Sequence, residues 1–231
     1  SILRGAAIAA ALIVAAGICR RFAYATQNEF ADKLANFIRI YIYIGLFAVW
    51  GVSIRRRVVQ VQARRYLEAA AAFMVLWLIL REYRWHLVIN EDIKRLLWYS
   101  YYIFILGIPL IALFVSMSLG RPETYRLPRS AALLYVPTAA LILLVLTNDL
   151  TQLVFRFPEN EVWTEDSYSY MPGFFIVGAW GVLCAAAAFA VMLTRCRLPK
   201  TRKFLWLPLI PFGAAVLYIV LYAARVPLVL S

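Results

Sequence analysis

A dense polar group ends one of the longest apolar runs of this chain. Residues 147–152 read TNDLTQ and follow the stretch VPTAALILLVL. If the segment is helical, Asn148 and Gln152 lie on one face and Thr147 and Thr151 on another, because residues four apart are neighbours on a helix. The group offers a carboxylate, two amides and two hydroxyls. Such side chains bind a ligand, or one another, through hydrogen bonds and ion pairs.

Four ionisable residues interrupt apolar stretches at one end of the predicted helices. Arg39, Arg156 and Arg225 are cationic, and Asp149 is the only acid among them. A charge in hydrocarbon costs about 2.5–3.5 kcal/mol on insertion scales, so it normally faces the bundle interior and is paired. We therefore predict that Asp149 pairs with Arg39 or Arg225. Two interpretations stay open: a salt bridge that fixes helix packing, and part of a signal or ligand pocket.

The composition places most of this polar chemistry in a membrane. The chain is 64% hydrophobic, with a mean hydropathy of +0.76, whereas soluble domains are roughly 45–50% apolar. Only helices and closed barrels satisfy their backbone groups in hydrocarbon. The apolar runs here are continuous and lack the alternation of barrel strands. The sequence therefore predicts an all-α, polytopic helical membrane protein.

Seven transmembrane helices are predicted in a single bundle. They cover residues 2–19, 35–53, 67–81, 96–118, 131–150, 173–194 and 204–224. Each is close to the roughly 20 residues that cross a bilayer core. The third is short, and we expect Tyr83 and Trp85 to lie at its outer interface.

The distribution of charge predicts the orientation of these helices. Thirteen of the 24 basic residues lie in the loops after the second, fourth and sixth helices, and nine of the 12 acidic residues lie in the other three loops. Cytoplasmic loops collect Lys and Arg. The N-terminus is therefore predicted to be cytoplasmic and Ser231 extracytoplasmic. The net charge of +12 indicates contact with anionic lipid headgroups of the bilayer at the cytoplasmic face, and no nucleic acid.

The predicted outer loop over residues 155–173 is acidic and rich in aromatic residues. It contains Trp163, Tyr168 and Tyr170. Aromatic side chains gather at membrane interfaces, so one interpretation is an interfacial belt. The other is a lid over a ligand.

No catalytic or metal-binding pattern is present in the sequence. There is no P-loop, no GxSxG, no HExxH and no glycine-rich dinucleotide loop. The three cysteines, Cys19, Cys184 and Cys196, lack metal-ligand spacing and are interpreted as small packing residues. We predict no enzyme activity, no metal and no cofactor for these residues.

Five segments of the chain carry a resemblance to a known family: LWYSYYIFILGIPLIALFVSMSLGRPETYRLPR, LLYVPTAALILLVLTNDLTQLVFRFP, YSYMPGFFIVGAW, CRLPKTRKFLWLPLIPF and IYIGLFAVWGVSIRRRVVQ. Together they resemble the seven-transmembrane N-terminal sensor region of bacterial membrane histidine kinases. The likeness covers most of the chain. Asn148, Asp149 and Gln152 keep the family pattern, whereas Thr151 stands where the family typically has a histidine.

The resemblance implies a receptor module in a bacterial plasma membrane. Such a module passes an extracytoplasmic or membrane signal, carried by a small ligand of unknown identity, to a cytoplasmic output domain, and the full-length proteins are expected to form homodimers. One more helix normally follows, so we expect these 231 residues to be part of a longer protein. The alternative function is a small-solute transporter or transporter subunit. It ranks lower because the sequence shows neither an internal repeat nor a midplane charge.

Overall fold

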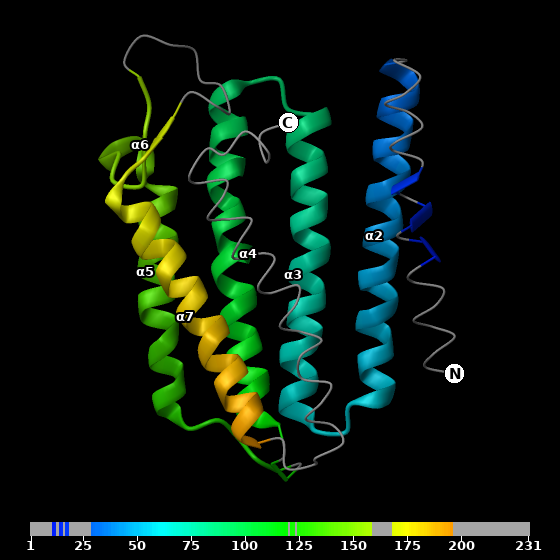
Figure 1. Ribbon diagram of the computed structural model, residues 1–231, viewed down its shortest axis with the longest axis vertical. Coiled ribbons are helices and arrows are strands. Elements are labelled where there is room, and N and C mark those ends of the chain that lie inside the picture. The colour runs from blue at the N-terminus through cyan, green and yellow to red at the C-terminus, as the bar shows by residue number, and fades with distance from the viewer. Residues whose placement is uncertain are drawn as a thin grey trace. The chain divides into compact units, whose positions relative to one another are not determined.

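A computed structural model describes residues 11–12, 14–15, 17–18, 29–119, 121–122, 124–158 and 168–195, and these are mostly helical (Figure 1). Four described helical segments are long and apolar enough to cross a membrane: Phe37–Arg56, Glu91–Ser118, Arg129–Leu146 and Pro172–Arg195. They indicate a membrane-embedded protein. The described residues of the predicted first helix, 2–19, are helical. The predicted seventh helix, 204–224, lies outside the described residues.

The observed helices are longer than predicted at several ends. Helix α2 spans Glu29–Arg57, α3 spans Val61–His86, α4 spans Glu91–Ser118 and α7 spans Pro172–Arg195. The prediction of a short third helix is wrong, because α3 continues beyond its uncharged stretch at both ends. Its 26 residues correspond to about 39 Å at 1.5 Å per residue. Hydropathy marks only the apolar part of a helix, whereas the backbone continues through charged residues.

The chain divides into two compact units, Ser1–Val59 with Leu67–Trp98 and Gln60–Tyr66 with Tyr99–Ser231. In the first unit, a Cβ on Gly51 of α2 would lie 3.2 Å from the Cβ of Ala71 in α3. Small residues of this kind let helices approach closely in membranes. The Arg55 Nε donates to Glu68 Oε1 at 3.0 Å and joins the same two helices.

Helix α4 begins in the first unit with a side-chain cap. The Asn90 Oδ1 accepts hydrogen bonds from the backbone N–H groups of Asp92, at 2.9 Å, and Ile93, at 3.3 Å. Glu91 and Asp92 supply negative charge in the first turn. Both features are typical of helix N-termini, where unpaired N–H groups and the helix dipole favour acceptors and anions. They explain why the helix starts five residues before the predicted residue 96.

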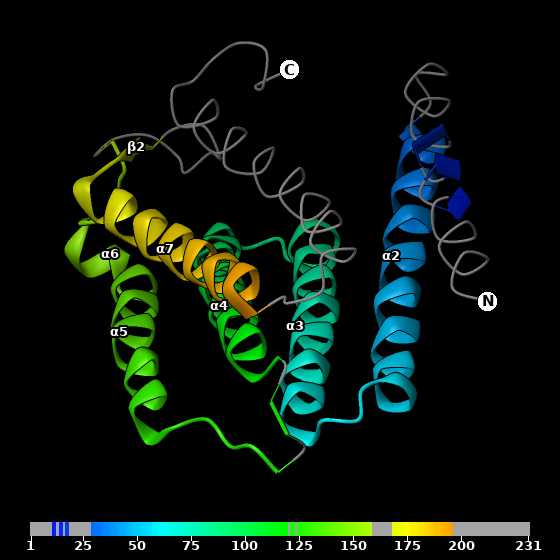
Figure 2. The same cartoon turned by 60° about the horizontal axis from the view of Figure 1, so that its bottom comes forward.

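The core of the second unit lies between α4, the segment after it and α7. One apolar cluster of this core consists of Leu110, Phe114, Ala131 and Cys184. The Phe114 ring lies 5.3 Å from that of Tyr66 and 5.1 Å from that of Tyr135. Figure 2 shows α4, α5 and α7 from a second direction. Cys184 is buried and unbonded, as expected of a packing residue.

The predicted helix over residues 131–150 is in fact three elements. They are a 3₁₀ helix, η1 (Arg129–Leu134), then α5 (Tyr135–Leu146) and a short α6 (Asn148–Thr151). Pro137 explains the first change, because it has no N–H and its ring clashes with the carbonyl four residues earlier. Thr147, at φ −94° and ψ 16°, separates α5 from α6. Its hydroxyl donates to the Leu143 carbonyl at 2.8 Å.

The second unit also contains a small β-hairpin that an all-α prediction does not include. Strands β1 (Phe155–Arg156) and β2 (Ser169–Tyr170) pair antiparallel, with Phe155 opposite Tyr170 and Arg156 opposite Ser169. The hairpin follows α6 and precedes α7, so it lies at one end of the second unit.

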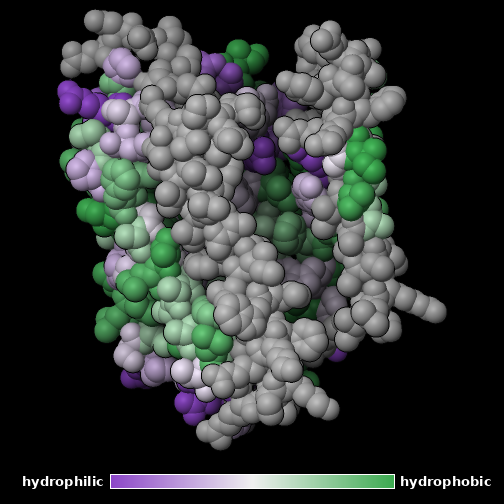
Figure 3. All heavy atoms as spheres, in the orientation of Figure 1, coloured by the Kyte–Doolittle hydropathy of each residue, from purple (hydrophilic) through white to green (hydrophobic). Residues whose placement is uncertain are grey.

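Figure 3 shows apolar residues along the described helices and polar residues toward their ends.

Candidate functional site

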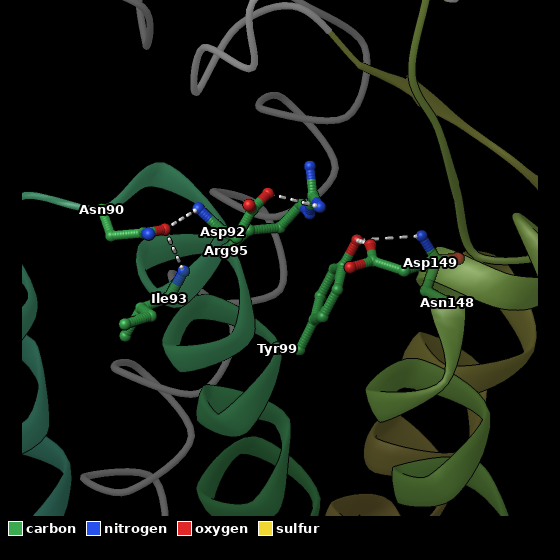
Figure 4. Close-up of polar contacts among 7 residues, drawn as sticks. All are labelled: Asn90, Asp92, Ile93, Arg95, Tyr99, Asn148 and Asp149. Atoms are coloured by element: carbon green, nitrogen blue, oxygen red, sulfur yellow. Dashed lines mark hydrogen bonds and ion pairs between the residues drawn. The ribbon is translucent and has the colours of Figure 1, made fainter.

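A buried polar junction forms where the predicted TNDLTQ segment meets α4. The Tyr99 hydroxyl donates to Asp149 Oδ1 at 2.7 Å and accepts from Asn148 Nδ2 at 3.2 Å. Figure 4 shows the Tyr99 side chain reaching from α4 to these two neighbours on α6. Tyr99 is fully buried. The structure therefore brings Asn148 and Asp149 together through a tyrosine that the sequence analysis did not identify.

Asn148 holds the loop after α6 with every hydrogen bond that its amide can make. Its Oδ1 accepts from the backbone N–H groups of Val154, at 3.0 Å, and Phe155, at 2.9 Å. Its Nδ2 donates to the Phe155 carbonyl at 2.9 Å as well as to Tyr99. An amide has two donors and two acceptor lone pairs, and all four are used. Because the side chain is also fully buried, Asn148 is a positioning residue.

Asp149 differs from Asn148 in its access to the surroundings. The residue as a whole is exposed, although one carboxylate oxygen accepts the Tyr99 hydroxyl. A hydrogen bond between a hydroxyl and a carboxylate is stronger than one between neutral groups. The junction therefore holds the Asp149 carboxylate beside Tyr99, near the start of α4. A carboxylate held in this way can bind a cation or a hydrogen-bond donor.

The side chain of Phe155 forms the centre of an aromatic cluster beside the junction. It is fully buried, and five rings surround it at centroid distances of 5.3–6.3 Å: Tyr99, Tyr102, Tyr168, Tyr170 and Phe174. Aromatic pairs at such separations stabilise a structure by about 0.5–1.5 kcal/mol each beyond their burial. The cluster links the hairpin to the first turns of α7 and to α4.

Two of the three aromatic residues predicted as candidates in the outer loop are described by the structure. Tyr168 is buried and Tyr170 is half-buried, and both pack in the Phe155 cluster. Their hydroxyl oxygens lie 3.5 Å apart. Trp163 lies outside the described residues. The choice between a belt and a lid stays a prediction, but two of the three residues have a packing role at the junction.

Gly173 allows the hairpin to approach the start of α7. Its N–H donates to the Leu153 carbonyl at 3.0 Å, and a Cβ at this position would lie 2.5 Å from the same oxygen. The Met171 N–H likewise donates to the Val154 carbonyl at 3.0 Å. The residues that precede β1 are thus joined backbone to backbone to the start of α7.

The remaining candidates of the segment lie at the surface. Thr151, Gln152 and Arg156 are exposed, and the Thr151 hydroxyl donates to the Thr147 carbonyl at 3.4 Å. Gln152 adopts the left-handed conformation, with φ 47° and ψ 30°, which a residue with a Cβ rarely takes. This conformation turns the chain from α6 toward Asn148's backbone partners. Gln152 therefore does not continue the helical face predicted for it.

The structure does not test the predicted ion pair between Asp149 and Arg39 or Arg225. Arg39 is half-buried on α2, in the first unit, and Arg225 lies outside the described residues. The pairing stays a prediction. No group of His, Cys, Asp or Glu that could hold a metal ion occurs in the part of the chain that the structure describes.

Tyr99 and Phe155 are the central residues of the site that sequence reasoning missed, and it also missed Tyr102, Gly173 and Phe174. A signal was available for Tyr99, which stands in the run WYSYY at residues 98–102, where polar hydroxyls enter an apolar stretch. Comparison of the chain with protein-family models, curated proteins and solved structures returns no match.

Proposed function

We propose that this chain is the receptor module of a bacterial membrane protein that signals through a histidine-kinase-like output domain. In this proposal it crosses the plasma membrane seven times, with its N-terminus in the cytoplasm and Ser231 outside. The Tyr99–Asn148–Asp149 junction is the part that receives a signal, a small ligand or a change in the membrane. The chain itself carries no catalytic activity and needs no cofactor. Its proposed partners are the bilayer and a second copy of the protein.

The observation that supports this proposal is the linkage at the junction. Asn148 bonds at once to Tyr99 of α4 and to the backbone of the hairpin, and the hairpin is bonded in turn to the start of α7. A ligand that favours one arrangement of these elements shifts the population toward it. A change at Asp149 therefore reaches α4, α5 and α7 together, which suits a receptor that transmits by helix movement.

The buried polar groups of the second unit favour a receptor over the alternative, a small-solute transporter. Away from the junction, its described buried polar residues are Ser116, Ser118 and Thr138. Each hydroxyl donates to a carbonyl of its own helical segment. A transporter places substrate-binding groups near the membrane midplane. The described part of the second unit has no buried charge at that depth.

The experiment uses the natural protein that contains these residues, reconstituted in lipid vesicles. Asp149→Asn keeps the size of the side chain and removes its charge, and Tyr99→Phe removes only the hydroxyl. We expect both to change the basal autophosphorylation at least severalfold. Tyr83→Phe, an exposed tyrosine of α3, is the control and should leave it unchanged.

Two results contradict the proposal. One is a natural protein without an output domain. The other is unchanged autophosphorylation in Asp149→Asn and Tyr99→Phe when both proteins are folded. Solute uptake into the same vesicles that depends on Asp149 favours the transporter instead.

A further inference from the structure

The opposite end of the second unit holds two distant segments together. The Gln62 Oε1 of α3 accepts from the Leu127 backbone N–H at 2.9 Å. The Gln60 Nε2 makes a longer hydrogen bond, 3.5 Å, to the Pro122 carbonyl. The segment over residues 119–129, which joins α4 to η1 and includes the first residue of η1, is thus fastened to the start of α3 at two points. Both amides make a side-chain-to-backbone contact across more than 60 residues of sequence.

Six cationic side chains belong to the segments that meet at this end. Two arginines come from the first turns of α3, three from the fastened segment and one from the end of α7: Arg64, Arg65, Arg121, Arg126, Arg129 and Arg195. The acidic side chain in the described part of these segments is Glu68, one turn after Arg64 and Arg65, and it accepts from the Arg55 Nε at 3.0 Å. The six arginines therefore outnumber the acidic side chains in the described part of this end.

Two of the six arginines have structural roles. The Arg195 Nη1 donates to the Met117 carbonyl at 2.8 Å, at the last turn of α4, where a cation is favoured by the unpaired carbonyls. The Arg121 guanidinium lies 5.1 Å from the centroid of the Tyr125 ring. Of the others, Arg65, Arg126 and Arg129 are exposed and Arg64 is half-buried. These four guanidinium groups are available to a ligand.

The position of these arginines at the ends of the apolar spans indicates which anion they bind. The candidate span Glu91–Ser118 ends just before the fastened segment, and the span Arg129–Leu146 starts at the last residue of that segment. The arginines thus lie where apolar helices leave the hydrocarbon. Lipid phosphates occupy this level, and basic clusters beside membrane helices recognise anionic headgroups.

We propose that Arg64 and Arg65, together with Arg126 and Arg129, form a discrete site for a phospholipid whose headgroup carries two phosphates. Each of the two segments supplies two guanidinium groups, and a guanidinium binds a phosphate through two parallel hydrogen bonds. One phosphate is bound by the α3 pair and the other by the pair from the fastened segment. The site needs Gln62 because that amide holds the two pairs together. It depends on the membrane location and is independent of the signal received at Tyr99 and Asp149.

The test measures binding of diphosphatidylglycerol to the full chain in neutral detergent by native mass spectrometry. Phosphatidylglycerol, phosphatidylcholine and inorganic pyrophosphate are titrated in parallel. We expect diphosphatidylglycerol to bind at least tenfold more tightly than phosphatidylcholine. Arg65→Gln and Arg126→Gln should each weaken it about fivefold, since one basic residue at a membrane surface contributes about 1 kcal/mol.

Two further variants distinguish a specific lipid-binding site from attraction of the lipid by the overall positive charge. Arg81→Gln removes an exposed arginine from the other half of α3 and should change the affinity less than about twofold. Gln62→Leu keeps every charge and should still weaken binding about threefold, because the loss of its hydrogen bond releases Leu127. Its melting curve in phosphatidylcholine verifies that the protein is folded.

Three outcomes overturn the proposal. If Arg81→Gln weakens binding as much as Arg126→Gln, the lipid is attracted by overall charge alone. If folded Gln62→Leu binds as tightly as the unchanged chain, the fastening builds no site. If pyrophosphate displaces the lipid at equal concentration, the ligand is a soluble phosphate compound.

Discussion

Asn148 shows how one buried side chain determines the course of a loop. Its amide oxygen accepts hydrogen bonds from the backbone N–H groups of Val154 and Phe155, at the point where strand β1 begins. Removing it leaves two N–H groups and a carbonyl without a partner in a buried place. Each buried polar group left in this way costs about 1–3 kcal/mol.

We therefore predict that Asn148→Leu lowers the free energy of unfolding by about 3 kcal/mol or more. Asn90→Ala is the matched control, since Asn90 also accepts two backbone N–H groups but at the exposed start of α4. Loss of such a cap costs about 1 kcal/mol. Reversible unfolding in mixed micelles measures both. Equal losses for the two variants contradict the assignment of Asn148 as the residue that holds the loop.

The glycines of α7 provide a second comparison at this scale. Gly173→Ala places a Cβ against the Leu153 carbonyl at 2.5 Å, whereas a Cβ at Gly178 meets no atom within 4 Å. We expect the first change to destabilise the protein by about 1–3 kcal/mol. Gly178→Ala should be neutral or stabilising by up to about 1 kcal/mol, because alanine is the better helix former. Thermal unfolding of both variants in the same detergent tests the difference, and a stable Gly173→Ala protein would show that the hairpin is not packed as described.

At the scale of the elements, hydropathy predicts where helices are and local chemistry decides how they begin and end. The apolar stretches predicted the cores of α2, α4 and α7. The interruption of residues 131–150 was missed because a single Pro137 and the backbone-bonding Thr147 act locally inside an apolar run. The two-residue strands carry no periodic pattern at all. Tyr99 joins residues 49 and 50 positions later, and a contact of that range follows from tertiary packing.

A hydrogen bond between two helices in the second unit gives the prediction that belongs to this scale. The Trp180 Nε1 of α7 donates to the Thr138 Oγ1 of α5 at 2.9 Å, and the same hydroxyl donates to the Leu134 carbonyl at 2.8 Å. The Thr138 hydroxyl, next to Pro137, thus connects Trp180 of α7 with the carbonyl of the last residue of η1. Hydrogen bonds between membrane helices contribute about 0.6 kcal/mol on average and up to about 1.7 kcal/mol.

We expect Trp180→Phe and Thr138→Val each to destabilise the protein and the double variant to lose less than their sum. The coupling should be about 0.6–1.7 kcal/mol, measured by unfolding in a double-mutant cycle. Trp50→Phe, an exposed tryptophan of α2, serves as the control for loss of an indole. Strict additivity of the two changes indicates that the hydrogen bond contributes nothing to the packing of α7.

At the scale of the whole molecule, the two ends of the second unit differ in chemistry. One has the Asp149 junction and the aromatic cluster, and the other has the arginines fastened by Gln62. The positive-inside rule predicts that the arginine end faces the cytoplasm. The segment between α2 and α3 is only three residues, 58–60, so the rule makes the same prediction for Arg55 as for Arg64.

This orientation predicts a pattern of labelling in intact cells. In a chain with Cys19→Ala, Cys184→Ala and Cys196→Ser, a cysteine at Val59 or Thr124 should react only after the membrane is made permeable. A cysteine at Ile89 or Leu150 should react from outside, because both residues are exposed. Ile89 lies in a loop predicted to be extracytoplasmic, and Leu150 is the last residue, at the outer end, of the predicted fifth helix. α3 must then cross the bilayer despite its charged ends. If Val59 and Ile89 are labelled from the same side, α3 does not cross. The seven-helix topology is then wrong, and the Asp149 junction and the arginine end have to be assigned to sides of the membrane anew.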